Sequence, residues 1–418
     1  MNARASANKR RQARTSNEHF SSLEMAVLSK SLLPEFWKRR TALRFCALVV
    51  LAFALASRSA SPANQDLAAR IDALLNSIKP SSPGAAVMVI QRGHPVFQRG
   101  YGATDLRSLH KLEERTNFRL ASVSKQFTAM AIMLLVHDGK LRYEQSLTSI
   151  FPEFPAYGKS ITIRQMLNHT SGLIDYEDLM AKQYGATPDD QIPQIHDAGV
   201  LALLEKVDTT KFPPGSKWEY SNSGYCLLAQ VVEKVSGESF GQFLQERIFA
   251  PLRMSNSVAF EKGKNEVANR AYGHTLVNGV WKETDQSSTS ATLGDGGVYT
   301  SMQDLARWDA ALRDHRLLNE TEMQPALTPV QPSGAPARET DGRLVSYGFG
   351  WFLEPYRSHP RMWHYGETVG FRTSIQRFPA DDLTVVVLCN RVDLSAPDLA
   401  LRIADLYLES TQPSQRSR

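Results

Sequence analysis

Segments with strand character lie at both ends of this chain, and a helix-rich stretch separates them. Residues 84–90 and 95–101 are apolar or strand-forming runs joined by a turn-like Arg-Gly pair, which predicts a β-hairpin. Residues 371–378 and 383–388 flank a Pro-Ala-Asp-Asp turn in the same way, and the Val/Leu-rich second run is expected to be buried. The sheet-forming residues therefore come from both ends of the chain.

Helical patterns fill the middle of the chain and border the strands. Apolar residues repeat at helical spacing within residues 66–76, and Ser395 can cap a helix that begins near Pro397. The stretch from about 141 to 273 is richer in helical patterns and in proline-bearing loops. This order predicts a mostly helical region inserted into a sheet domain made of residues 66–140 and 274–410.

The composition is that of a globular protein whose folded body carries no basic surplus. The 418 residues are 42% hydrophobic and 22% charged, enough for one large or two medium cores. The net charge of +5 comes from residues 1–56, which hold ten Lys/Arg and three Asp/Glu; the remainder holds 38 basic and 40 acidic residues. We therefore expect no nucleic-acid partner, because phosphate binding needs clustered positive charge.

The first 56 residues have the pattern of a secretory signal. Four basic residues between 38 and 44 precede an apolar run, residues 45–56, that ends in the small-x-small triplet Ala-Leu-Ala. This run is shorter than the roughly 20 residues of a membrane-spanning helix, so we expect cleavage, with an uncleaved anchor as the alternative. Met25 is an alternative start. We expect the protein in the periplasm or outside the cell, with residues 411–418 as a flexible tail.

The cysteines and histidines give no sign of a metal site. Cys226 and Cys389 lie in apolar runs, where a free thiol behaves as a small hydrophobe, so we expect both to be buried and unpaired. The chain has neither His-Glu-x-x-His nor Cys-x-x-Cys. We expect no metal and no cofactor.

Ser122 and Lys125 form a Ser-x-x-Lys pattern at the start of an apolar, helix-like run that ends at Gly139. Side chains three residues apart lie on one face of a helix, so the Lys125 amine can approach the Ser122 hydroxyl. A serine needs a base to accept its proton, and a buried lysine can lose its charge and serve. The pattern also occurs at Ser6 and Ser108, but neither precedes a long apolar helix.

Two further short motifs carry side chains suited to a cleft. Tyr220 and Asn222 form the chain's one Tyr-x-Asn, on a predicted loop; a phenol there can relay protons and a carboxamide can hold a substrate amide. His364 and Gly366 form a His-x-Gly that enters the strand-rich end, where an edge strand could supply N–H groups. Each also fits a plainer role: Tyr220 in packing, Asn222 in a turn, His364 as a hydrogen-bonded core histidine.

In this order the three motifs resemble the serine β-lactamase and penicillin-binding-protein superfamily, which includes class C β-lactamases, DD-peptidases and family VIII esterases. The resemblance spans about residues 66–410. Three accessory stretches support it, namely Asn168-His-Thr-Ser-Gly-Leu173, Pro214-Gly-x-x-Trp-x-Tyr-Ser-Asn222 and Gly294-Asp-Gly-Gly-Val-Tyr-Thr-Ser301. We interpret His169 and the Gly296-Gly297 pair as structural.

The resemblance implies an α+β fold, an antiparallel sheet flanked by helices with an inserted helical domain, and a site at their junction. Ser122 would attack a carbonyl, with Lys125 and Tyr220 handling its proton and Asn222 orienting the acyl side chain. The oxyanion would lie between the backbone N–H groups of Ser122 and Glu367. The implied function is hydrolysis of an ester or amide through an acyl-enzyme, on a small-molecule or peptide substrate.

The third motif departs from that of class C β-lactamases, which carry Lys-Thr-Gly where this chain has His364-Tyr365-Gly366. We expect His364 to be partly charged near neutral pH and to capture a lactam carboxylate weakly. Small esters and D-amino-acid peptides are thus expected to be better substrates than penicillins. Two alternatives remain. One is an α/β-hydrolase, disfavoured because the Gly-x-Ser-x-Gly at residues 237–241 follows a helix-like run and not the strand that a nucleophile elbow needs. The other is a non-catalytic penicillin-binding or sensor protein on the same scaffold.

The leader pattern makes a prediction that protein chemistry can test. Because the apolar run 45–56 inserts into the export machinery and is then cut off, the mature protein should begin near Ser57. N-terminal sequencing of the protein from its native host checks this. Residues before Phe45 in the mature protein would instead support a membrane anchor.

Overall fold

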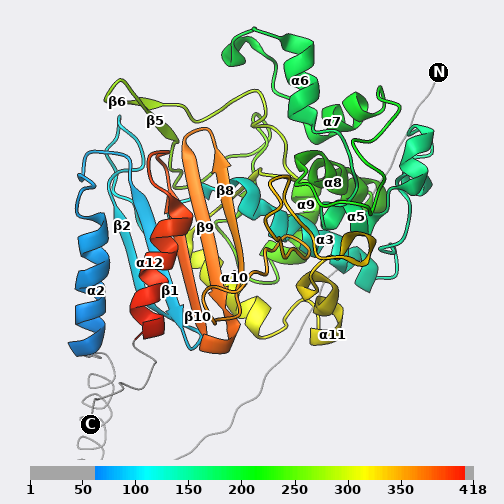
Figure 1. The fold of residues 1–418 in the computed structure, drawn as a ribbon. Helices are drawn as coiled ribbons and strands as arrows, with labels where there is room; N and C mark the ends of the chain where they lie inside the picture. The colour runs from blue at the N-terminus through cyan, green and yellow to red at the C-terminus, as the bar shows by residue number, and fades with distance from the viewer. Residues whose placement is uncertain (1–61, 410–418) are drawn as a thin grey trace, which may run out of the picture. The chain divides into compact units, whose positions relative to one another are not determined.

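The computed structural model describes residues 62–409 (Figure 1). The predicted leader, its cleavage point and the tail 411–418 lie outside the described residues.

An antiparallel sheet of five strands is built from both ends of the chain, as predicted. Its order is β2-β1-β10-β9-β8, so the last strand in sequence lies in the middle and pairs with the first, with Val87 opposite Val387. Both predicted hairpins are present, β1 with β2 and β9 with β10. The strands are β1 (Ala85–Gln91), β2 (His94–Tyr101), β8 (Met362–Thr368), β9 (Phe371–Phe378) and β10 (Leu383–Cys389).

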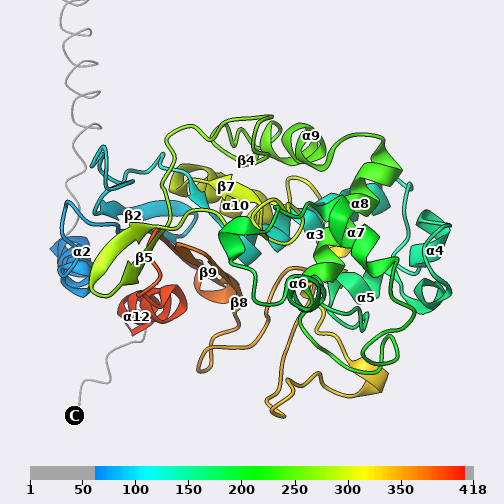
Figure 2. The same ribbon diagram turned by 90° about the horizontal axis from the view of Figure 1, so that it is seen from above.

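The two terminal helices cover one face of this sheet (Figures 1 and 2). They are α2 (Pro62–Leu75) and α12 (Ala396–Leu408), whose apolar residues pack with Val87, Val385 and Phe378 into one core. The Ser395 side chain caps α12 by accepting from the Asp398 N–H, as the sequence predicted. Helix and strand faces thus bury each other's apolar side chains.

Helix α10 (Met302–Arg313) lies on the opposite face of the sheet (Figure 2). Its buried Asp309 accepts hydrogen bonds from Arg377 Nε on β9 and Thr384 Oγ1 on β10, both at 2.7 Å. A three-stranded sheet on this side consists of β3 (Phe118–Arg119), β7 (Val298–Thr300) and β4 (Val258–Ala259). Strand β3, which shortly precedes Ser122, therefore lies on the same side of the five-stranded sheet as α10.

The middle of the chain forms a helical region around two long helices in contact, α3 (Lys125–His137) and α8 (Asn222–Ser236). Around them lie α4 (Leu147–Ile150), α5 (Ile163–Leu167), α6 (Tyr176–Tyr184), α7 (Asp197–Leu204) and α9 (Phe240–Leu244). The remaining elements are the hairpin β5 (His274–Val277) and β6 (Val280–Glu283), helix α11 (Glu320–Met323), and the short helical turns η1 (Ala121–Ser124), η2 (Ala156–Ser160), η3 (Asp189–Gln191), η4 (Gln245–Phe249), η5 (Gln324–Leu327), η6 (Pro332–Gly334) and η7 (Pro379–Asp381).

Cys226 and Cys389 are buried and free, as predicted. Within residues 62–409, no helix has the length and apolar character to cross a membrane. The same residues contain no group of three or more His, Cys, Asp or Glu side chains placed to hold a metal ion.

Candidate active site

Ser122 lies in the turn η1, which connects β3 to α3. Ala121, just before it, has a φ of 49°, a conformation that costs a non-glycine residue about 1–3 kcal/mol. Ala121, Val123 and Ser124 are buried, whereas Ser122 is partly exposed. The turn therefore presents a single hydroxyl to a pocket and holds its neighbours in the core.

Lys125 begins α3, and its side chain is fully buried at 0% exposure. Its Nζ donates to Ser122 Oγ at 3.1 Å, to Asn222 Oδ1 at 2.9 Å and to the carbonyl oxygen of Asp295 at 3.0 Å. In the neutral amine form, the same 3.1 Å contact lets Lys125 accept the Ser122 proton. The predicted nucleophile and base are therefore in direct contact.

Tyr220 and Asn222 approach Lys125 from the start of α8. Ser221 caps this helix by accepting from the Gly224 N–H, which makes Asn222 its first residue. The Lys125 Nζ lies 4.9 Å from the ring centroid of Tyr220, an attractive contact for a cation. Tyr220 thus lies on the loop that the sequence predicted, whereas Asn222 is the first residue of the helix.

His169 supports the Tyr220 side of the site. It has a φ of 62°, its Nδ1 accepts from the Ser221 N–H at 3.1 Å, and its ring lies 4.3 Å from that of Tyr220. Burial lowers the pKa of His169 well below its usual value, so the ring is neutral at pH 7. His169 therefore fixes the chain just before Asn222.

His364 lies on β8, the edge strand nearest Ser122, and is fully buried. Its Nδ1 donates to the carbonyl of Tyr365 at 2.7 Å, and its Nε2 accepts from the Tyr347 hydroxyl at 3.1 Å. Burial, and then the charge of Lys125, lower the pKa of His364 to about 3. The expectation of a partly charged His364 was wrong, because its pKa depends on burial that sequence does not reveal.

Gly366 and Glu367 follow on the same strand and border the nucleophile. A Cβ at Gly366 would lie 2.1 Å from the Leu120 carbonyl oxygen, so only glycine lets β8 pack against η1. This contact brings Glu367 and Ser122 to the rim of one pocket. Their backbone N–H groups are the donors expected for an oxyanion.

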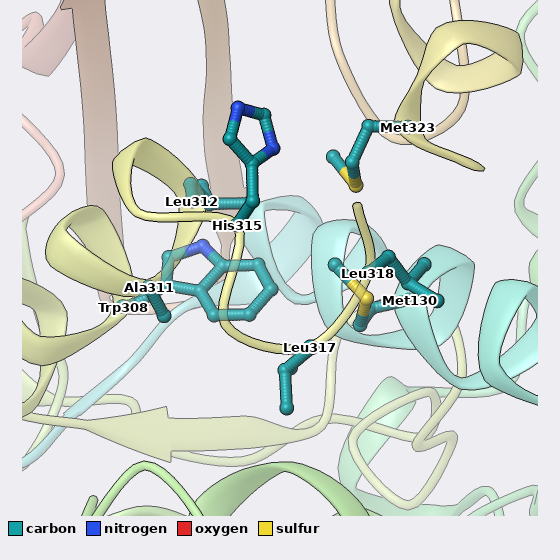
Figure 3. A pocket seen from close by; sticks show the side chains of 8 residues that line it. All are labelled: Met130, Trp308, Ala311, Leu312, His315, Leu317, Leu318 and Met323. Carbon is teal, nitrogen blue, oxygen red and sulfur yellow. The ribbon is translucent and has the colours of Figure 1, made fainter. Parts of the chain in front are cut away.

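The pocket that contains Ser122 is small and polar, with a volume of about 50 Å³. Its lining comes from Arg119, Ala121, Ser122, Tyr176, Glu177, Asn222, Thr289, Thr292, Asp295, Gly296, Glu367 and Thr368. A cavity of about 10 Å³ near α3 and α10 is lined mainly by apolar side chains such as Met130 and Trp308 (Figure 3). That cavity has room for at most one water molecule and none for a substrate.

Sequence reasoning missed the acidic side of this pocket. Asp295 is 7% exposed; its Oδ2 accepts from the Tyr176 hydroxyl at 3.2 Å, while its Oδ1 has no hydrogen-bond partner. The stretch 176–199 contains α6 and the start of α7, with Asp175 capping α6. The glycines around Asp295 marked a tight turn but gave no hint of its contacts.

The carboxyl groups near the pocket raise one another's pKa. Loss of hydration, followed by the charges of Asp175 and Asp295, raises the pKa of Glu177 to about 7. Burial raises the pKa of Asp175 as well. Three acidic side chains, Glu177, Asp295 and Glu367, thus line the pocket with one basic side chain, Arg119.

Comparison with known proteins agrees with the fold and with the motifs. The family model described as Beta-lactamase matches residues 66–408. Penicillin-binding protein 4* of Bacillus subtilis is 30% identical over 339 residues, covering 78% of this chain and 72% of that protein. A D-aminopeptidase of Cereibacter sphaeroides is 30% identical over 325 residues, covering 77% of this chain but only 58% of the longer relative.

The solved structures include a penicillin-binding protein from Bacillus halodurans with a TM-score of 0.68 and 28% identity, covering 81% of this chain and 98% of that one. The family match over residues 66–408 covers both the antiparallel sheet and the helical region. The chain therefore belongs to the beta-lactamase family and is a serine hydrolase of the group that contains penicillin-binding proteins and D-aminopeptidases.

Proposed function

We propose that this protein is an exported serine hydrolase that forms an acyl-enzyme on D-amino-acid amides or peptides, or on small esters, in preference to β-lactams. The contact between Lys125 Nζ and Ser122 Oγ carries the catalytic part of the proposal. The charge of the pocket carries the choice of substrate. Export rests on the leader pattern of residues 1–56.

The reaction consists of two acyl transfers. Ser122 Oγ bonds to the substrate carbonyl carbon while its proton passes to the Lys125 amine, and the oxyanion accepts from the N–H groups of Ser122 and Glu367. Collapse breaks the bond to the amine or alkoxide, which takes up the proton by way of Lys125 and Tyr220. Water then attacks the ester on Ser122 by the same route, releasing the acid and restoring the serine hydroxyl.

The charges around Ser122 favour a substrate with an ammonium group over one with a carboxylate. His364 is neutral, so the third motif offers no cation to a lactam carboxylate. Asp295, Glu177 and Glu367 line the pocket and outnumber its one basic side chain, Arg119, and one oxygen of Asp295 has no partner. An α-ammonium next to the scissile carbonyl would supply the missing positive charge.

The first prediction concerns the nucleophile and its base. Ser122→Ala should abolish labelling by a fluorescent phosphonate, because it removes the attacking oxygen. Lys125→Ala should slow acylation by at least about 100-fold, the usual cost of losing a general base. In-gel fluorescence and stopped-flow acylation measure these effects.

Ser124→Ala is the matched control for the nucleophile. Ser124 lies in the same turn, but its hydroxyl accepts from the Val298 N–H and is buried in the core. This variant should keep its label. Labelling that persists in Ser122→Ala would refute the assignment of the nucleophile.

The second prediction concerns substrate charge. D-alanine p-nitroanilide should have a kcat/KM at least about tenfold above that of its N-acetyl derivative, because a charge-assisted hydrogen bond contributes about 1.5–3 kcal/mol. It and p-nitrophenyl butyrate should both exceed nitrocefin. Glu177→Gln should reduce the preference for the free amine.

Asp178→Asn is the control for that variant. It makes the same change of charge one residue along α6, but Asp178 faces Lys211 and does not line the pocket. Its preference should stay at the wild-type value. A nitrocefin kcat/KM tenfold above those of the other substrates would overturn the choice of substrate.

The third prediction concerns stability against pH. The fold lowers the pKa of His364 to about 3 from the ordinary histidine value of about 6.5. Because the unfolded chain binds a proton at this histidine before the folded protein does, the free energy of unfolding is at its full value above about pH 6.5 and decreases as the pH falls. The decrease from this one group is on the order of 2 kcal/mol between about pH 6.5 and 5. In urea titrations, the free energy of unfolding of His364→Gln should decrease less over that range than that of the wild type. Some decrease should remain, because His169 is a second buried histidine with a lowered pKa. Equal losses in both proteins would contradict a neutral His364.

A further inference from the structure

Asp197 is a buried carboxylate that the mechanism above does not use. It is the first residue of α7 and is 5% exposed. Its Oδ2 accepts from the Leu293 N–H at 2.8 Å and its Oδ1 from the Gly294 N–H at 3.1 Å. The residue after Gly294 is Asp295, and its backbone carbonyl accepts from Lys125 Nζ. Asp197 is thus two contacts away from the catalytic base.

Residues 293–295, here called the lysine-binding loop, are held on two further sides. Thr128 Oγ1 of α3 donates to the Gly294 carbonyl at 2.6 Å. A Cβ at Gly294 would lie 2.2 Å from the Tyr225 carbonyl oxygen of α8, so the loop lies directly against that helix. A shift of this loop would therefore move the Asp295 carbonyl and, with it, the Lys125 Nζ that donates to it.

We propose that Asp197 is a positioning residue: its carboxylate holds the lysine-binding loop so that the Asp295 carbonyl keeps Lys125 Nζ directed at Ser122. The inference rests on the proposed function in one respect, that Lys125 accepts the Ser122 proton. A misplacement of about 1 Å can cost a catalytic group about 100-fold in rate, so a device of this kind has a measurable effect.

The protonation state of Asp197 adds a specific signature. An ionised carboxylate accepts from both loop N–H groups, whereas a protonated one turns one oxygen into a donor and leaves an N–H poorly matched. Burial, and then the charge of Asp295, raise the pKa of Asp197 to about 7. The other facing groups are the Cys226 thiol of α8, which bonds Asp197, and the Tyr176 hydroxyl of α6, which bonds Asp295.

The loop should therefore be held best above about pH 7 and less firmly below it. Asp197→Asn imitates the protonated acid at every pH, because an amide offers one acceptor oxygen and one donor nitrogen. Asp189→Asn is the matched control. Asp189 accepts from the N–H and hydroxyl of Ser288 in the same segment, but it does not touch the lysine-binding loop.

The experiment measures acylation by p-nitrophenyl butyrate from pH 5.5 to 9 in the wild type and in both variants, and each protein also carries Glu177→Gln so that the Glu177 carboxyl, whose pKa is also about 7, contributes no inflection. We expect Asp197→Asn to lower the acylation rate by about tenfold at pH 8 with KM changed less than about twofold, and to lose the inflection near pH 7. Asp189→Asn should keep the wild-type rate and profile. An Asp197→Asn profile that retains the inflection, or a loss equal to that of Asp189→Asn, overturns the proposal.

A second variant keeps the test open if Asp197→Asn does not fold. Thr128→Val removes the Thr128 hydrogen bond to the Gly294 carbonyl and leaves Asp197 in place. It should show the same loss of acylation rate at unchanged KM, and a folded Thr128→Val protein with a normal rate would overturn the proposal. Phosphonate labelling of the wild type separates the two hypotheses, because a wild type that does not label defeats the proposed function, not the role of Asp197.

Discussion

The buried amino group of Lys125 constrains the rest of the structure. A polar group taken out of water needs hydrogen bonds that replace its hydration, since leaving it unpaired costs about 1–3 kcal/mol. Its three acceptors come from the turn before α3, from the start of α8 and from the lysine-binding loop. Three segments far apart in sequence therefore have to converge on one nitrogen atom, and the helical region and the sheet meet where they do.

The contact between Ser122 and Lys125, the proposed catalytic pair, could be predicted from sequence because it is local. Ser122 and Lys125 are three residues apart at a helix start, so a single turn of backbone brings them into contact, and the hairpins follow from alternating runs and turn residues in the same way. Asp295 contacts Lys125 through its backbone carbonyl. Tyr176 and Asp197 bond to residues about 100 positions away in the sequence. No spacing rule reports such contacts, and composition reveals only that acidic residues exist.

The charge of His364 shows the same limit for a single residue. Its place on an edge strand was predicted from the pattern of the C-terminal strands, and β8 is indeed the edge. Its ionisation depends on how completely the strand packs against Tyr347 and η1, which belongs to the tertiary structure. Position along the chain thus indicated where the residue lies, while the surrounding core decides what it can do chemically.

The pairing of β1 with β10 has a consequence for the order in which this protein folds. Strands β1 and β10 are separated by nearly the whole described chain, and contacts of such long sequence range slow folding because closing a long loop costs conformational entropy. The five-stranded sheet is not complete until β10 has paired with β1 and β9. Ser122 and Lys125 can meet within one turn of helix, but Glu367 joins them only when β8 is secured on β9. A chain that lacks its last strands can therefore form the Ser122–Lys125 contact, but it has neither the complete sheet nor the Glu367 N–H beside Ser122.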